Sequence, residues 1–191
     1  MNNIIINILG ESISIKEKML VDETFLDKID EAAKKIADTF ISGGKVFFCG
    51  NGGSAAIAQH IAAEMVGRFQ KERKGLPVIA LTTDTSVLTA IANDYGFEKI
   101  FERQIEALCS DKDIVVGITT SGDSLNVKMA LLAAKQTGAF TIGLLGKDGG
   151  ICKDFCNIAL LVKENDTARI QEIHILIGHI ICRLIENYLY E

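Results

Sequence analysis

The hydrophobic pattern of this 191-residue chain changes from helical spacing to short apolar runs near residue 44. Before that point apolar side chains recur every three or four residues, first around Ile5 and Ile8 and again from Leu26 to Phe40, which predicts amphipathic helices. Gly43 and Gly44 form a natural end to the second helix. The runs that follow predict parallel strands. These are Val46–Cys49, Val78–Thr82, Ile114–Ile118, Thr141–Leu145 and Ile158–Val162.

Helical stretches are predicted between these strands. They are Ala55–Val66, Ser86–Ala92, Lys99–Leu108 and Leu125–Gln136. Strands that alternate with helices predict an α/β fold, a doubly wound five-stranded parallel sheet whose ligands lie beyond the carboxyl ends of the strands. No internal linker or repeat interrupts the chain, so we expect one domain over residues 1–191, with a helical segment at 1–43 and the α/β core and C-terminal helix at 44–191.

The final stretch, Thr167–Tyr190, is predicted to be one long helix. Its apolar side chains cover more than half of the circumference, so it needs burial on several sides. The N-terminal helical segment also exceeds what a five-stranded sheet must cover. We therefore expect both ends of the chain to pack against other subunits, the alternative being an intramolecular helix pair in a monomer.

Composition narrows the class of protein. Hydrophobic residues make up 48% of the chain, charged residues 24%, and the formal net charge is -5, which argues against a nucleic-acid surface or a disordered chain. Five cysteines at irregular spacing suit reduced thiols, and the Cys152/Cys156 pair has no second pair to complete a zinc site. We see no signal peptide and no apolar run of about 20 residues, so we expect a soluble, cytoplasmic protein with no membrane partner.

Two glycine- and serine-rich loops follow strands and precede helices, at Cys49–Ser54 and Thr119–Ser124. The first N–H groups of a helix have no intrahelical partner, glycines allow a ligand to approach the backbone, and hydroxyls donate to phosphate oxygens. Neither loop matches a nucleotide-binding pattern, which favours a small phosphorylated metabolite. The alternative is that Ser54 and Ser124 are ordinary N-caps.

Polar side chains also occur on helices that are otherwise small and apolar. His60 and Glu64 are four residues apart, hence on one face, and Gln171 and His179 are eight apart on the terminal helix. His174 lies nearly on the opposite face of the helix and is a weaker candidate for the site. Such a set suits proton transfer or a divalent ion such as zinc, although each histidine alone could be an ordinary core or surface residue.

Six runs of sequence make the comparison specific: CGNGGSAA, QHIAAE, ALTTDTS, AIANDYGFE, TTSGDS and TARIQEIHILIGH. Over roughly residues 40–190 the chain resembles the phosphoheptose isomerase family of sugar isomerase (SIS) domains. The resemblance implies a SIS fold and a homotetramer with active sites at subunit interfaces. It also implies isomerisation of D-sedoheptulose 7-phosphate to D-glycero-D-manno-heptose 7-phosphate, a step toward bacterial lipopolysaccharide or capsule.

The same resemblance assigns roles to residues. Glu64 and His179 match the acid–base pair of the family. Positions that match its substrate- and phosphate-binding groups are Asn51, Gly52, Gly53, Ser54, Arg68, Asp94, Thr119, Thr120, Ser121, Ser124 and Gln171. Where members carry zinc (Zn2+), one ion per subunit, the ligands resemble His60, Glu64, Gln171 and His179. Because His179 lies on the terminal helix, we expect Glu64 and His179 to meet across a subunit boundary.

Three positions depart from the usual pattern. Ile57 stands where Asp is common, Thr119 replaces Ser, and Asp123 replaces a frequent Asn. Thr119 keeps the hydroxyl, whereas the Asp123 carboxylate is unfavourable beside a phosphate unless it points outward. Two other functions are therefore open: a non-catalytic SIS protein that binds a replication initiator or other protein, and an isomerase of another phosphorylated ketose.

Overall fold

The computed structural model describes residues 2–190, and five parallel strands form its single sheet. The strands are β1 (Val46–Gly50), β2 (Val78–Ala80), β3 (Ile114–Thr119), β4 (Phe140–Gly146) and β5 (Ile158–Val162), in the order β2-β1-β3-β4-β5. Every neighbouring pair is parallel, which confirms the predicted doubly wound sheet. The strand order reverses between β1 and β3, so their carboxyl ends form the topological switch point where ligands bind in such folds.

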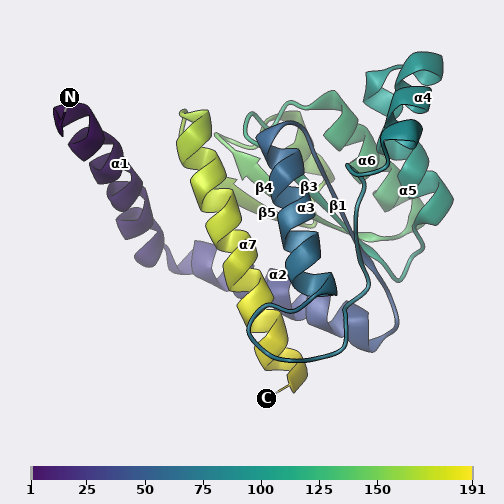
Figure 1. The fold of residues 1–191 in the computed structure, drawn as a ribbon, viewed down its shortest axis with the longest axis horizontal. Helices are drawn as coiled ribbons and strands as arrows, with labels where there is room; N and C mark the ends of the chain where they lie inside the picture. Colours follow the sequence, from purple (N-terminus) through teal and green to yellow (C-terminus); the bar gives the residue numbers. More distant parts are fainter. Residues whose placement is uncertain (1, 191) are drawn as a thin grey trace.

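The described part of the chain contains seven α-helices. They are α1 (Asn2–Leu20), α2 (Glu23–Ile41), α3 (Gly53–Val66), α4 (Thr85–Tyr95), α5 (Glu102–Leu108), α6 (Leu125–Thr137) and α7 (Thr167–Tyr190). Helices α2, α3 and α7 cover one face, against side chains such as Phe48 and Val116. Helices α5 and α6 cover the other, against Phe47 and Val115 (Figure 1). This alternation along β1 and β3 is why fully buried strands read as continuous apolar runs.

Some boundaries differ from the predictions. Strand β2 ends at Ala80 instead of Thr82, because only its three residues pair with β1 at this sheet edge. The helix predicted from Lys99 is a 3-10 turn at Phe97–Lys99 followed by α5. A second 3-10 segment, Gly150–Phe155, precedes β5. The remaining strands and helices lie where the apolar periodicity predicts them, within a few residues.

The two ends of the chain differ in how much of their apolar surface is covered. Helix α7 packs on α2 and α3 in its own chain, which supplies most of the burial that its apolar circumference requires. Helix α1 projects away from the sheet (Figure 1), and only Ser12 and Ile15 on it are buried. Its uncovered apolar residues are Ile4, Ile5, Ile6, Ile8, Leu9, Ile13 and Leu20. Packing between subunits therefore stays a prediction, and α1 is the end of the chain that needs it.

Two further expectations concern the rest of the chain. All five cysteines lie within residues 2–190 and are free thiols. Burial raises the pKa of Cys152 to about 11 and of Cys156 to about 12, so both thiols are protonated, in keeping with a structural interpretation of this pair. Across residues 2–190, no helix has both the length and the apolar character needed to cross a membrane.

Candidate active site

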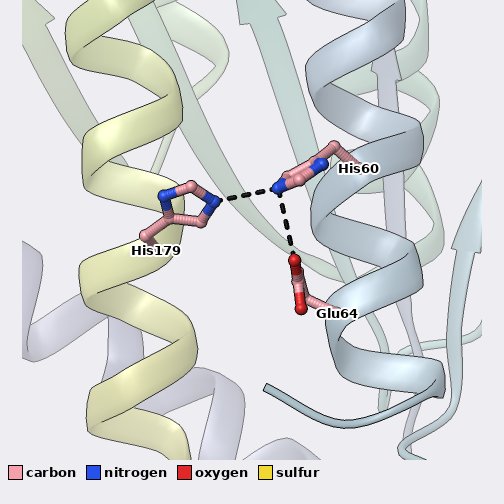
Figure 2. A group of neighbouring side chains, drawn as sticks. All are labelled: His60, Glu64 and His179. Carbon is pink, nitrogen blue, oxygen red and sulfur yellow. Dashed lines mark hydrogen bonds and ion pairs between the residues drawn. The ribbon is translucent and has the colours of Figure 1, made fainter. Parts of the chain in front are cut away.

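Helices α3 and α7 lie side by side and bring His60, Glu64 and His179 together (Figure 2). The Nε2 atoms of His60 and His179 are 2.9 Å apart, and His60 Nε2 lies 3.3 Å from Oε1 of Glu64. The rings of the two histidines meet edge to face, with centroids 5.1 Å apart. Potential ligand atoms of all three residues lie within 4.8 Å of one another. The structure thus assembles three of the residues that the sequence predicts to act together.

The three side chains remain accessible, with 47% of the His60 side chain and 27% of the Glu64 side chain exposed. The two facing imidazole nitrogens lie at hydrogen-bond distance, and either ring can be the donor. Both histidines and the carboxylate come from one chain. The expectation that Glu64 and His179 meet across a subunit boundary was therefore wrong, because α7 folds back onto α3 of its own chain.

Two other candidate residues of α7 are Gln171 and His174. The Gln171 amide lies against Gly53, where a Cβ would collide with it, so Gln171 lies beside the phosphate end of α3. Its place as a metal ligand stays a prediction. His174 is fully buried, and within residues 2–190 neither ring nitrogen forms a hydrogen bond. Burial lowers the pKa of His174 to about 4, an effect that the neighbouring Leu145 backbone only partly offsets.

The first glycine loop leads directly into α3. Gly52, with φ 56°, is the N-cap residue and offers no side chain, whereas Ser54 is buried in the first turn. The interpretation of Ser54 as an N-cap was therefore wrong. Within residues 2–190 the N–H groups of Gly52 and Gly53 form no hydrogen bond, and both glycines are exposed. They are the free donors that an anion at a helix N-terminus requires.

The second loop gathers hydroxyl groups at the end of β3. Ser124 occupies the N-cap position of α6, but its hydroxyl does not cap the helix and lies 2.9 Å from Oγ1 of Thr119. Oγ of Ser121 lies 3.3 Å from the same Thr119 atom. The Thr120 hydroxyl forms no hydrogen bond within the described residues. These hydroxyls can therefore turn toward a bound anion without uncapping a helix.

A reciprocal amide pair joins the two loops. Asn51 Nδ2 donates to Asn126 Oδ1, and Asn126 Nδ2 donates to Asn51 Oδ1, each at 2.8 Å. Asn126 is buried, and it did not figure among the predicted site residues. An amide two residues after Ser124, in the first turn of the helix that follows the second loop, was the signal available. The Asn51 side chain therefore holds the loops in register.

The departures from the family pattern have structural explanations. The Asp123 carboxylate accepts a hydrogen bond from the Ile151 N–H at 3.2 Å, so it points toward the 3-10 segment. Ile57 is buried in the core beneath α3. Arg68 and Asp94 are exposed and, within residues 2–190, bond only to Glu72 and Asn93. The single chain does not bring these last two residues to the cluster.

One aromatic residue that the sequence did not indicate touches the cluster. The Phe69 ring stacks on His179, with centroids 5.7 Å apart and an interplanar angle of 24°. Phe69 follows α3 in a loop of mixed polarity, where no periodic pattern marks it. This contact restricts the orientation of the His179 ring.

Comparison with known proteins agrees with this geometry. The SIS domain family profile matches residues 13–146. Phosphoheptose isomerase of Aliarcobacter butzleri is 55% identical over 169 residues, which covers 88% of this chain and 89% of that protein. The Clostridium acetobutylicum phosphoheptose isomerase is 49% identical over 190 residues, 100% of this chain and 97% of that one.

Solved structures show the same relationship. The phosphoheptose isomerase from Neisseria gonorrhoeae has a TM-score of 0.89 at 43% identity, covering 97% of this chain and 98% of that chain. The Francisella tularensis phosphoheptose isomerase has a TM-score of 0.92 at 39% identity, with 97% of each chain covered. The chain therefore belongs to the phosphoheptose isomerase family of SIS-domain proteins.

Proposed function

We propose that this protein is an aldose–ketose isomerase that converts D-sedoheptulose 7-phosphate to D-glycero-D-manno-heptose 7-phosphate. The supporting observation is that one helix, α3, begins at a phosphate-type loop and carries His60 and Glu64 against His179. Relatives named phosphoheptose isomerase, 49% to 55% identical over most of the chain, support the choice of substrate.

The phosphate group would sit at the switch point of the sheet. Its donors are the N–H groups of Gly52 and Gly53 and the hydroxyls of Ser54, Thr119, Thr120, Ser121 and Ser124. His60 lies seven residues after Gly53, so at 1.5 Å per residue it is about 10 Å further along α3. Ala56, which lies between them, is exposed and small enough to let a sugar chain pass. The reacting carbons would then lie beside His60, Glu64 and His179.

The reaction requires a proton to move between adjacent carbons. Glu64 is placed to remove a proton from C1 of the ketose, which gives an enediol(ate), and to return it at C2. His179 would move a proton between the two substrate oxygens, supplying it to O2 as the carbonyl electrons shift and accepting one from O1 as the aldehyde forms. Both groups remain as they began after each turnover.

The cluster also fits a zinc ion. Two imidazole nitrogens and a carboxylate oxygen within 4.8 Å are donors that zinc prefers. His60, Glu64 and His179 would hold the ion, with Gln171 the predicted fourth ligand. Glu64 cannot be a saturated metal ligand and a free base at once, so its carboxylate would act as the base only while it is not bound to the ion. When bound, zinc would supply Lewis-acid stabilisation to the substrate oxygens.

We further propose that the protein acts as a homotetramer in the cytoplasm, in heptose synthesis for lipopolysaccharide or capsule. The exposed isoleucines of α1 offer apolar surface for subunit contacts. Arg68 and Asp94, which the single chain leaves apart from the cluster, would complete the site of a neighbouring subunit.

The decisive experiment is incubation of the pure protein with sedoheptulose 7-phosphate in D2O, with added zinc and with a chelator. Formation of the aldose phosphate with deuterium at C2 is the expected result, because the proton that Glu64 takes from C1 exchanges with solvent before a proton is returned at C2. Glu64→Gln is the matched control and should give no product. Absence of product under all conditions would reject the proposed reaction, and turnover of another ketose phosphate alone would reassign the substrate.

A further inference from the structure

Glu186, near the end of α7, is a carboxylate held inside the protein. Its side chain is 1% exposed and accepts hydrogen bonds from the N–H groups of Phe69, Gln70 and Lys71 at 3.1, 2.9 and 3.0 Å. Arg73 Nε donates to it at 3.0 Å. Burial alone would raise the pKa of Glu186, but these backbone donors and Arg73 outweigh burial and lower it. Glu186 is therefore ionised and fixes the loop that follows α3.

Arg73 extends this network to the catalytic helix. Its side chain is 2% exposed, and its guanidinium group donates from Nη2 to the Glu64 carbonyl at 3.0 Å and from Nη1 to the Met65 carbonyl at 2.7 Å. Both carbonyls lie in the last turn of α3, where helical partners run out. Arg73 thus ties the backbone of Glu64 to α7 through Glu186.

The Glu186 carboxylate also fixes Phe69, the aromatic residue in contact with His179. Glu186 binds the backbone N–H of Phe69, whose ring stacks on His179. His179 lies seven residues before Glu186, about two turns away on the same face of α7. One buried ion pair therefore fixes Glu64 by its carbonyl and His179 by an aromatic contact.

We propose that Arg73 and Glu186 are positioning residues that set the place of Glu64 and, through Phe69, the orientation of the His179 ring. This inference rests on the proposed isomerase function. The phosphate loops lie at the opposite end of α3, so disturbing the pair lowers turnover and leaves substrate binding intact. Misplacing a reacting group by about 1 Å can cost on the order of 100-fold in rate.

The chain contains a matched control at the amino ends of the strands. The Asp113 carboxylate is also 1% exposed and accepts hydrogen bonds from backbone N–H groups, those of Lys45 and Ser110, at 2.7 and 2.8 Å. Lys45 supplies the charge partner, with Nζ 3.3 Å from the carboxylate. Asp113→Asn therefore damages a similar buried network far from the phosphate loops and the histidines.

The experiment compares Arg73→Lys, Glu186→Gln and Phe69→Leu with Asp113→Asn. Arg73→Lys keeps the charge and loses the planar fork that binds four backbone carbonyls and a carboxylate. We expect each of the three to lower kcat for sedoheptulose 7-phosphate roughly 10- to 100-fold with KM changed by less than about threefold. Asp113→Asn should lower Tm and leave kcat unchanged. A pair that only stabilised the fold would behave like Asp113→Asn.

A second measurement needs no substrate. The chain has three histidines, so the His179 ring resonances can be assigned by comparison with His179→Ala. We expect these resonances to move in Arg73→Lys and Glu186→Gln, because the Phe69 ring shifts, and to stay in place in Asp113→Asn. If the wild-type protein does not isomerise the sugar, the proposed function fails, but unchanged His179 resonances in Arg73→Lys would separately overturn the positioning role.

If Arg73→Lys and Glu186→Gln fail to fold, Phe69→Leu still tests the proposed positioning role. This variant keeps the backbone N–H that Glu186 accepts, and Phe69 is only partly buried, so the fold should persist. Unchanged kcat in a folded Phe69→Leu protein would overturn the proposal.

Discussion

A Cβ placed on Gly178 would collide with Cδ1 of Ile61 and lie 2.8 Å from its Cγ1. Gly178 precedes His179 on α7 and Ile61 follows His60 on α3, so this glycine lets the two helices approach closely beside the two histidines. In most helices Gly→Ala stabilises by up to about 1 kcal/mol. Here Ile61 is buried at 1% exposure, so its side chain can shift only by displacing other core residues, and overpacking costing about 1–3 kcal/mol should prevail.

We therefore expect Gly178→Ala to lower both the free energy of unfolding and turnover. Gly10→Ala is the control, because nothing lies within 4 Å of a Cβ at that helical position. Urea unfolding and steady-state kinetics on both variants test this. Equal stability and activity of the two variants would show that the helices can separate at no cost.

Removal of either acid–base group should stop the chemistry and leave the fold unchanged. Glu64→Gln and His179→Ala are expected to lower kcat by roughly 100-fold or more, as for groups that transfer protons. Circular dichroism and Tm would verify the fold in each case. Turnover near that of the wild type in either folded variant would remove that residue from the mechanism.

Mixing these two inactive variants should not restore activity. Glu64 and His179 lie in the same chain, so a mixed oligomer contains no chain with both groups. Exchange of labelled subunits, followed by mass spectrometry, would verify that mixed oligomers form. Recovered isomerisation in such mixtures would mean that the two groups act from different subunits.

Loss of a loop hydroxyl should weaken phosphate binding more than it slows turnover. Hydrogen bonds to charged groups contribute about 1.5–3 kcal/mol, so Ser54→Ala, Ser121→Ala and Ser124→Ala should each raise KM about tenfold or more. Ser42→Ala, at the end of α2, is the control because within residues 2–190 its hydroxyl donates to the Thr39 carbonyl and to no other group. Unchanged KM in all three loop variants would place the phosphate elsewhere.

His174 should make the folded protein sensitive to acid. Burial lowers its pKa from 6.5 to about 4, so between those values the unfolded chain binds a proton that the folded chain does not. Above pH 6.5 the ring is neutral in both states and does not affect stability. As the pH falls toward 4, the free energy of unfolding decreases by about 3 kcal/mol because only the unfolded chain binds the proton. His174→Leu should flatten that part of the stability profile by this amount, measured as urea midpoints against the wild type. If stability fell equally with pH in His174→Leu and the wild type, His174 would not be the source of the acid sensitivity.

The sequence predicted what depends on local spacing. Apolar runs and glycine loops located β1, β3 and the start of α3, and the four-residue interval placed His60 and Glu64 on one face. The contacts that complete the site join residues far apart in sequence, such as Asn51 with Asn126 and Phe69 with His179. Periodicity carries no record of such pairs, because they depend on how closely the packed helices approach.

The interval between the start of α3 and the His60/Glu64 turn also has a consequence for selectivity. A helix is stiff, so with the phosphate held at Gly52 and Gly53 the acid–base groups stand at a fixed reach from it. A three- or four-carbon sugar phosphate anchored at the same loops would hold its carbonyl short of His179. The fixed distance along α3 would then select substrates by chain length, independently of contacts with their hydroxyl groups.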